Sequence, residues 1–204
     1  MLLSLLIVRL FDSAVWGTMV GIIVIQQVLN SIISWGNKDF LQRELALNPS
    51  EFNYSFSAFL QERFIVFLLA IGCCYLFNWI SYAYFFGFCM LVFAKFMQQS
   101  FDILVLREKR FVLVTVLEVV FLILQLALLF YLYQIGIKSP STLFVIFWLP
   151  SLVKSIILLV VFRNYLERKL TPGTYLRKSF FFGLLSFSGL VHSKIDLLRV
   201  RGNC

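Results

Sequence analysis

The sequence predicts an all-α membrane protein, a polytopic bundle of about six to seven transmembrane helices. Hydrophobic residues make up 61% of the 204 residues and charged residues only 14%. Soluble domains of this size are roughly 45–50% apolar and about 25% charged. The apolar residues also gather in runs as long as the roughly 20 residues that cross a bilayer. So little polar material cannot cover a water-facing surface, and lipid is therefore the expected solvent.

The first two apolar segments differ in length. Residues 1–11 would cover only roughly 16 Å of a ~30 Å hydrocarbon layer, so we expect half a membrane helix whose beginning is missing. Residues 14–34 predict a full span, in which Gly17 and Gly21 permit close helix contact. The same span carries a polar stripe, formed by Gln26, Gln27 and Asn30. The stripe indicates either hydrogen bonds between helices or a water-filled cavity.

The middle of the chain contains an interfacial segment and two spans. Residues 35–62 mix apolar and charged residues around Pro49, which predicts an amphipathic helix at the membrane interface, a loop and a second short helix. Residues 63–101 are nearly all apolar and too long for one span. A break near Asn78-Trp79 divides them into helices over about 63–78 and 81–101.

Three more spans follow, over residues 111–136, 141–162 and 179–195. Charged residues interrupt the end of the last one. Alternate connections between the spans are basic. Their cations are Lys38, Arg43 and Arg63, then Arg107, Lys109 and Arg110, then Arg163, Arg168, Lys169, Arg177 and Lys178. The opposite loops hold essentially Lys138 alone. This asymmetry predicts that the basic loops face the cytoplasm, and it accounts for the net charge of +8 without a nucleic-acid partner.

Four ionisable residues fall well inside apolar spans: Arg9, Lys95, Glu118 and Lys154. Each would cost roughly 2.5–3.5 kcal/mol if it faced lipid, so we expect them to face protein or water. One interpretation is a structural ion pair of Glu118 with Lys95 or Lys154. The other is a cationic cavity for an anion such as phosphate or pyrophosphate. In that cavity Arg9, Lys95, Lys154 and Lys194 would bind the anion, and Glu118 and Asp196 would balance charge or carry a coupling proton.

The sequence contains no catalytic or metal-binding pattern. There is no G-x-S-x-G, H-E-x-x-H or phosphate-binding glycine loop, and His192 is the only histidine. Cys73, Cys74, Cys89 and Cys204 form no C-x-x-C, and we interpret the first three as small apolar helix residues. We therefore predict a protein that is not an enzyme and needs no cofactor or metal.

Three segments resemble Wzx-type polysaccharide flippases of the multidrug/oligosaccharidyl-lipid/polysaccharide exporter superfamily. The opening, LIVRLFDSAVWGTMVGIIVIQQVLNSIISWGNKDFLQREL, is similar to the family's first two helices and the stretch after them. Its matching residues are Arg9, Gly17, Gly36, Arg43 and Glu44. SFDILVLREKRF resembles the family's loop after the fourth helix, with Asp102 before the basic run Arg107 to Arg110. SFFFGLLSFSGLVHSKIDLL looks like the seventh helix, which ends in a triplet matching Lys194-Ile195-Asp196.

The resemblance implies a multi-pass protein of the bacterial plasma (inner) membrane that moves a polyprenyl-pyrophosphate-linked oligosaccharide between leaflets by alternating access. It implies membrane lipid as surroundings and other polysaccharide-assembly membrane proteins as partners. Residues 1–170 would form the N-terminal lobe, and residues 171–204 would begin a second lobe truncated after its first helix. Half of an alternating-access pair would then be missing, so we expect no transport by this chain alone.

Two other functions stay open at this point. The first is an exporter of small cations in the same superfamily, coupled to Na⁺ or H⁺, against which the excess of intramembrane cations argues. The second is a non-transporting membrane protein, either an assembly partner or a gene fragment, which the ends of the sequence favour.

Overall fold

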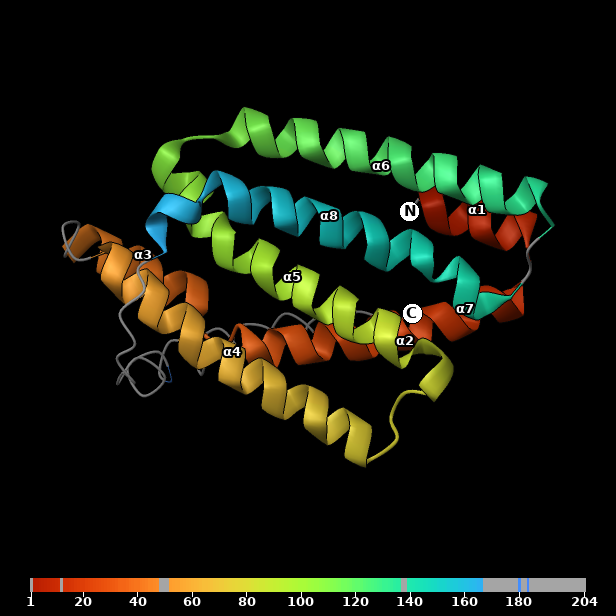
Figure 1. Cartoon of the computed structure of the whole chain (residues 1–204), viewed down its shortest axis with the longest axis horizontal. Helices are drawn as coiled ribbons and strands as arrows, with labels where there is room; N and C mark the ends of the chain where they lie inside the picture. The colour runs from red at the N-terminus through yellow and green to blue at the C-terminus, as the bar shows by residue number, and fades with distance from the viewer. Residues whose placement is uncertain are drawn as a thin grey trace, which may run out of the picture. The chain divides into compact units, whose positions relative to one another are not determined.

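Helices account for all the secondary structure in the computed structural model, which describes residues 2–11, 13–47, 52–136, 139–166, 180 and 183. The elements are α1 (Leu2–Leu10), α2 (Ser13–Ile33), α3 (Asn37–Leu47), α4 (Phe52–Leu76), α5 (Tyr82–Glu108), α6 (Phe111–Gln134), α7 (Pro140–Leu143), α8 (Val145–Val161) and the 3₁₀ helix η1 (Arg163–Tyr165). Figure 1 shows α5, α6 and α8 of the first compact unit running alongside one another. The predicted all-α class is confirmed for this part of the chain.

Five helical segments are long and apolar enough to cross a membrane: α2, α4, α5, α6, and α7 together with α8. They correspond to five of the predicted spans, as expected of a membrane-embedded protein. The predicted count of six to seven is not confirmed. The apolar start of the chain forms the nine-residue α1, and the predicted span over 179–195 lies outside the described residues except for Phe180 and Gly183.

The predicted break in the long apolar stretch is confirmed. α4 ends at Leu76 and α5 begins at Tyr82. Between them Asn78 has a φ of 50°, a left-handed conformation that asparagine tolerates better than most residues. The ring of Tyr75 lies 5.4 Å from that of Phe85, which pairs the two helices just beyond the turn. Two apolar helices, rather than one, therefore separate the basic connections on either side.

Two predicted boundaries are wrong. α4 begins at Phe52, so the expected second short helix and the following span form one continuous helix of 25 residues. The polar residues that suggested a boundary are buried against protein. Arg63, which we predicted in a loop, is 2% exposed, donates a hydrogen bond to the Trp35 carbonyl and lies 5.0 Å from the Phe59 ring centre. Likewise α5 continues to Glu108 instead of ending near residue 101.

The chain divides into two compact units. The first contains residues 1–33 and 66–163, and the second contains residues 34–65 and 164–204. α4 therefore begins in the second unit and ends in the first. Within the second unit, the separate helix α3 was correctly predicted, and its Phe40 ring stacks on that of Phe59 in α4 at 6.1 Å.

In the first unit α5 is the central helix. It packs against α2 on one side and α8 on the other, and α6 lies beyond α8 (Figure 1). A Cβ added at Gly87 of α5 would lie 2.7 Å from Cδ1 of Trp148 in α8. The indole therefore occupies the space that a side chain at position 87 would need, which lets α5 and α8 approach closely.

A cluster of apolar side chains joins α1 to the bundle at one end. Its buried members come from five helices and are Ile7, Met19, Leu129, Leu143 and Ile146. α1 packs on α6 only near the C-terminal end of that helix, since the α6 residues in this region are Leu128, Leu129 and Leu132. The N-terminal half of α6 is therefore supported mainly by α8.

Candidate functional site

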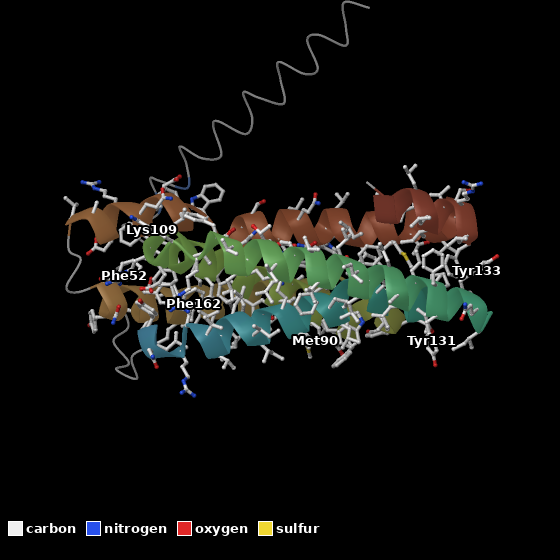
Figure 2. All side chains as sticks on the ribbon, turned by 90° about the horizontal axis from the view of Figure 1, so that it is seen from above. Phe52, Met90, Lys109, Tyr131, Tyr133 and Phe162 are labelled. Carbon is white, nitrogen blue, oxygen red and sulfur yellow. The ribbon has the colours of Figure 1, made fainter. Side chains whose placement is uncertain are left out.

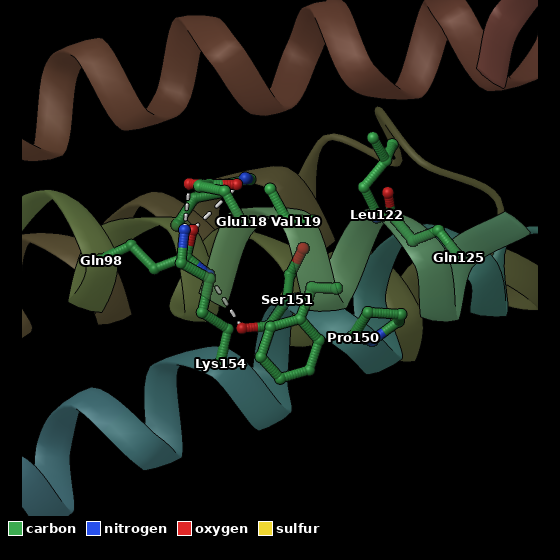
Figure 3. A pocket seen from close by; sticks show the side chains of 10 residues that line it. Gln98, Glu118, Val119, Leu122, Gln125, Pro150, Ser151 and Lys154 are labelled. Atoms are coloured by element: carbon green, nitrogen blue, oxygen red, sulfur yellow. Dashed lines mark hydrogen bonds and ion pairs between the residues drawn. The ribbon is translucent and has the colours of Figure 1, made fainter. Parts of the chain in front are cut away.

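Three of the predicted intramembrane charges line one cavity between α5, α6 and α8. They are Lys95, Glu118 and Lys154, and the cavity has a volume of about 300 Å³. Figure 3 shows Glu118 and Lys154 among the side chains that line it. The other lining residues are Gln98, Val119, Phe121, Leu122, Gln125, Pro150 and Ser151. The structure thus brings together charges separated by more than 50 residues in the sequence.

Lys154 and Glu118 form an ion pair across the α6–α8 contact. Lys154 Nζ donates to Glu118 Oε1, as the dashed line in Figure 3 marks. The lysine side chain is only 8% exposed, whereas the glutamate side chain is 64% exposed. The two interpretations drawn from the sequence therefore coexist, because an ion pair forms the wall of a cavity.

Lys95 reaches the same cavity from α5 and has an amide partner. Lys95 Nζ donates to Gln98 Oε1 at 3.4 Å, a long hydrogen bond. The Gln98 amide nitrogen donates to the Ser151 carbonyl of α8 at 2.8 Å, and the Ser151 hydroxyl donates to the Phe147 carbonyl at 2.7 Å. These bonds orient Gln98 so that its oxygen faces Lys95. A lysine that makes one long hydrogen bond to a neutral amide can donate instead to a charged acceptor, with which the hydrogen bond is stronger.

A second cavity of about 220 Å³ shares several walls with the first and adds an acid. It is lined by Lys95, Gln98, Gln99, Asp102, Val114, Glu118, Lys154 and Leu158. Sequence reasoning assigned Asp102 to a loop and did not include Gln98. Both could have been found from helical spacing, since residues 95, 98, 99 and 102 lie on one face of a helix. The two cavities together contain two lysines and two acids.

The other predicted site residues do not join this group. Arg9 is exposed and lines neither cavity. Two residues beyond it, the Phe11 ring contacts that of Tyr133 at 5.9 Å. Tyr133 lies 15 residues after Glu118 on α6, which at 1.5 Å per residue places it about 22 Å along the helix. Lys194 and Asp196 lie outside the described residues.

The polar stripe and the glycine pair of α2 also have defined environments. Gln26 and Asn30 are buried and Gln27 is exposed, and none of the three lines either cavity. Two of the three stripe residues are therefore enclosed by protein, and the choice between hydrogen bonds between helices and a water-filled cavity stays a prediction. An added Cβ at Gly17 or Gly21 would have no neighbour among the described atoms within 4 Å. The glycine pair therefore makes no close helix contact in the part of the chain that is described.

Among the described residues, no cluster of three or more His, Cys, Asp or Glu side chains is arranged to hold a metal ion. Comparison with protein-family models, with curated proteins and with solved structures gave no match. The chemistry of the α5–α6–α8 cavity is therefore the basis for assigning a function.

Proposed function

We propose that this chain supplies one lobe of a translocation path for a lipid-linked oligosaccharide, and that the α5–α6–α8 cavity binds the pyrophosphate of that lipid. The observation that carries the proposal is Lys95, a cation between apolar spans whose hydrogen bond goes to a neutral amide. Charge in such surroundings is costly, and a bound anion would offset that cost. Lysine and amide groups are suitable donors to phosphate oxygens.

The charges divide the cavity into two parts. Lys154 is already paired with Glu118, so Lys95 is the first cation that an incoming anion would meet. Lys154 could contribute a second contact if Glu118 moved away or became protonated. Because Glu118 and Asp102 repel an anion, we expect binding of moderate affinity, as release on the far side of a membrane requires.

The size and position of the cavity fit a headgroup better than a whole oligosaccharide. A volume of about 300 Å³ is at the lower end of the roughly 300–1,000 Å³ typical of small-molecule sites. Glu118 is largely exposed on the side of α6, so the cavity opens beside that helix. The neighbouring α6 residues Val119 and Leu122 are exposed and apolar, which suits contact with a lipid chain.

Binding of farnesyl pyrophosphate to the purified full chain in nanodiscs tests this proposal, with farnesol as the ligand that lacks the anion. We expect farnesyl pyrophosphate to bind and Lys95→Ala to weaken its binding by about 10–150-fold, the effect of losing one charged hydrogen bond of about 1.5–3 kcal/mol. Arg9→Ala is the matched control, because it removes an exposed cation that lines neither cavity. Equal binding of both ligands, or an equal loss in both variants, would contradict the proposal.

Glu118→Gln separates this function from export of a small cation. If the ligand is an anion, removing the carboxylate lowers repulsion and releases Lys154, so binding of farnesyl pyrophosphate should become tighter. If the ligand is a cation, the same change removes an attractive charge. Tighter binding of an organic cation such as tetraphenylphosphonium to the parent protein than to Glu118→Gln, without any response to farnesyl pyrophosphate, would favour the cation exporter.

A further inference from the structure

A cluster of exposed cations marks one end of the three helices that form the cavity. It consists of Lys109 and Arg110, which join α5 to α6, and Arg163, which follows α8. All three side chains are exposed. We refer to these three residues as the basic cluster.

Local structure fixes where the cluster lies. The backbone N–H of Lys109 donates to the Leu106 carbonyl at 3.3 Å and that of Arg110 to the Val105 carbonyl at 3.1 Å. Lys109 has a φ of 54°. This pattern is a Schellman motif, which ends α5 and reverses the chain. Lys109 and Arg110 form the whole connection, and α6 begins at the next residue. Lys109 and Arg110 are therefore held at the end of both helices.

Aromatic contacts bring the end of α8 to the same place. The Arg110 guanidinium lies 5.9 Å from the centre of the Phe162 ring, and that ring stacks on Phe101 of α5 at 5.9 Å. Phe162 is 1% exposed and immediately precedes Arg163. Figure 2 shows Lys109 and Phe162 at one end of the helices and Tyr131 and Tyr133 at the other.

The charge at this end is strongly one-sided. Within the part of the chain that the structure describes, Glu108 pairs with the cluster, at 3.7 Å from Arg110. Three cations and one acid leave a surplus of positive charge. By contrast, residues 77–81 and 131–144, which border the opposite ends of the spans, contain Lys138 as their one charged residue. The cluster thus combines exposed positive charge with a position at the ends of three apolar helices.

We infer that the basic cluster binds the anionic headgroups of phospholipids in the leaflet that it faces. Helix ends lie at the depth of the headgroups when the apolar segments occupy the hydrocarbon layer. Lysine and arginine at that depth are attracted to a negatively charged leaflet, and arginine donates to phosphate oxygens through two nitrogens. This inference does not depend on the α5–α6–α8 cavity or on its proposed ligand.

Reconstitution of the full chain into nanodiscs of phosphatidylglycerol or phosphatidylcholine, with thermal stability as readout, tests the inference. We expect a higher melting temperature in phosphatidylglycerol, and we expect the difference to shrink as salt is raised. Competition for bound phosphatidylglycerol, measured by native mass spectrometry, should weaken by about fivefold for each cation removed.

Two variants distinguish charge from structure. Lys109→Gly combined with Arg163→Gln removes two charges, and glycine suits the left-handed conformation of position 109. Lys109→Arg combined with Arg163→Lys keeps both charges. We expect the first variant to lose most of the preference for phosphatidylglycerol and the second to keep it. The inference is wrong if the parent shows no preference, if the first variant keeps it, or if inorganic phosphate added to phosphatidylcholine nanodiscs reproduces the stabilisation.

Discussion

At the scale of single residues, the arrangement of Lys154 and Glu118 explains how charge is accommodated among apolar helices. The lysine is buried and the glutamate is mostly exposed, so the pair joins the protein interior to the open side of the cavity. A lone charge at this depth would cost roughly 2.5–3.5 kcal/mol. Each partner therefore reduces the cost of the other, and removing one should affect stability more than removing both.

A double-mutant cycle on this pair tests that expectation. We predict that Lys154→Met destabilises the protein and that adding Glu118→Gln restores part of the loss, with a coupling of about 0.5–3 kcal/mol. Unfolding by sodium dodecyl sulfate in mixed micelles provides the free energies. The same cycle with Lys95→Met in place of Lys154→Met should give a smaller coupling, because Lys95 donates to Gln98. Additive effects in the first cycle would show that the ion pair contributes nothing.

The residue scale also shows what the sequence can and cannot predict about the site. The free-energy cost of a charge in lipid led us to predict that Lys95, Glu118 and Lys154 avoid lipid. The structure places all three on one cavity. The same reasoning does not locate Arg9, which is exposed and lines neither cavity, because the cost of a charge in lipid does not say where in the bundle that charge lies. Asp102 was missed because it was assigned to a loop, whereas it lies on the same helix as Lys95.

At the scale of helices, close approach between α5 and α8 depends on the small residue Gly87. Trp148 fills the space beside it, and the Phe86 ring lies 5.8 Å from the same indole, in an edge-on arrangement. These two helices carry Lys95 and Lys154. The spacing between the helices therefore also determines the spacing between the two cations.

We predict that Gly87→Ala lowers the melting temperature and that Gly72→Ala does not. An added methyl group at position 87 meets the indole at 2.7 Å, and overpacking of this kind costs about 1–3 kcal/mol. At position 72 nothing described lies within 4 Å, and glycine to alanine inside a helix stabilises by about 0.5–1 kcal/mol. Thermal unfolding in detergent compares the two variants. An equal response would mean that the indole moves aside without cost.

Some helix boundaries could be predicted from the local sequence and others could not. The break at Asn78 was predictable because a polar residue interrupts an apolar run at half its length. The start of α4 was not, because Glu62 and Arg63 resemble a loop until their burial is known. Tertiary contacts, such as the one between Arg63 and the Trp35 carbonyl, make these residues compatible with a continuous helix.

At the scale of the whole molecule, the alternation of basic and neutral connections defines a topology. If they cross a bilayer in turn, the five apolar helices would place residues 77–81 and 135–136 on one side and residues 109–110 and 162–163 on the other. The cations gather on the second side, which is the pattern of a cytoplasmic face. The sequence predicts this sidedness from the distribution of lysine and arginine, which needs no knowledge of packing, and it stays a prediction.

Cysteine labelling in intact cells tests this topology. In a variant whose four native cysteines are replaced, we predict that Asn78→Cys and Ser139→Cys react with a membrane-impermeant maleimide added outside. Lys109→Cys and Asn164→Cys should react only after the cells are permeabilised. Labelling of Asn78→Cys and Lys109→Cys from the same side would mean that α5 does not cross the membrane.

The exposed position of α6 has a mechanical consequence. Only Phe121 and Leu129 of its 24 residues are buried, so among the described residues α8 and the end contact with α1 supply most of its support. A helix of this length extends about 36 Å, somewhat more than the ~30 Å hydrocarbon layer, and it must tilt to fit. Glu118 is carried by α6 and Lys154 by α8. Bilayer thickness should therefore determine how strongly the Lys154–Glu118 ion pair holds the cavity closed. Acyl-chain length thereby becomes a means of opening it.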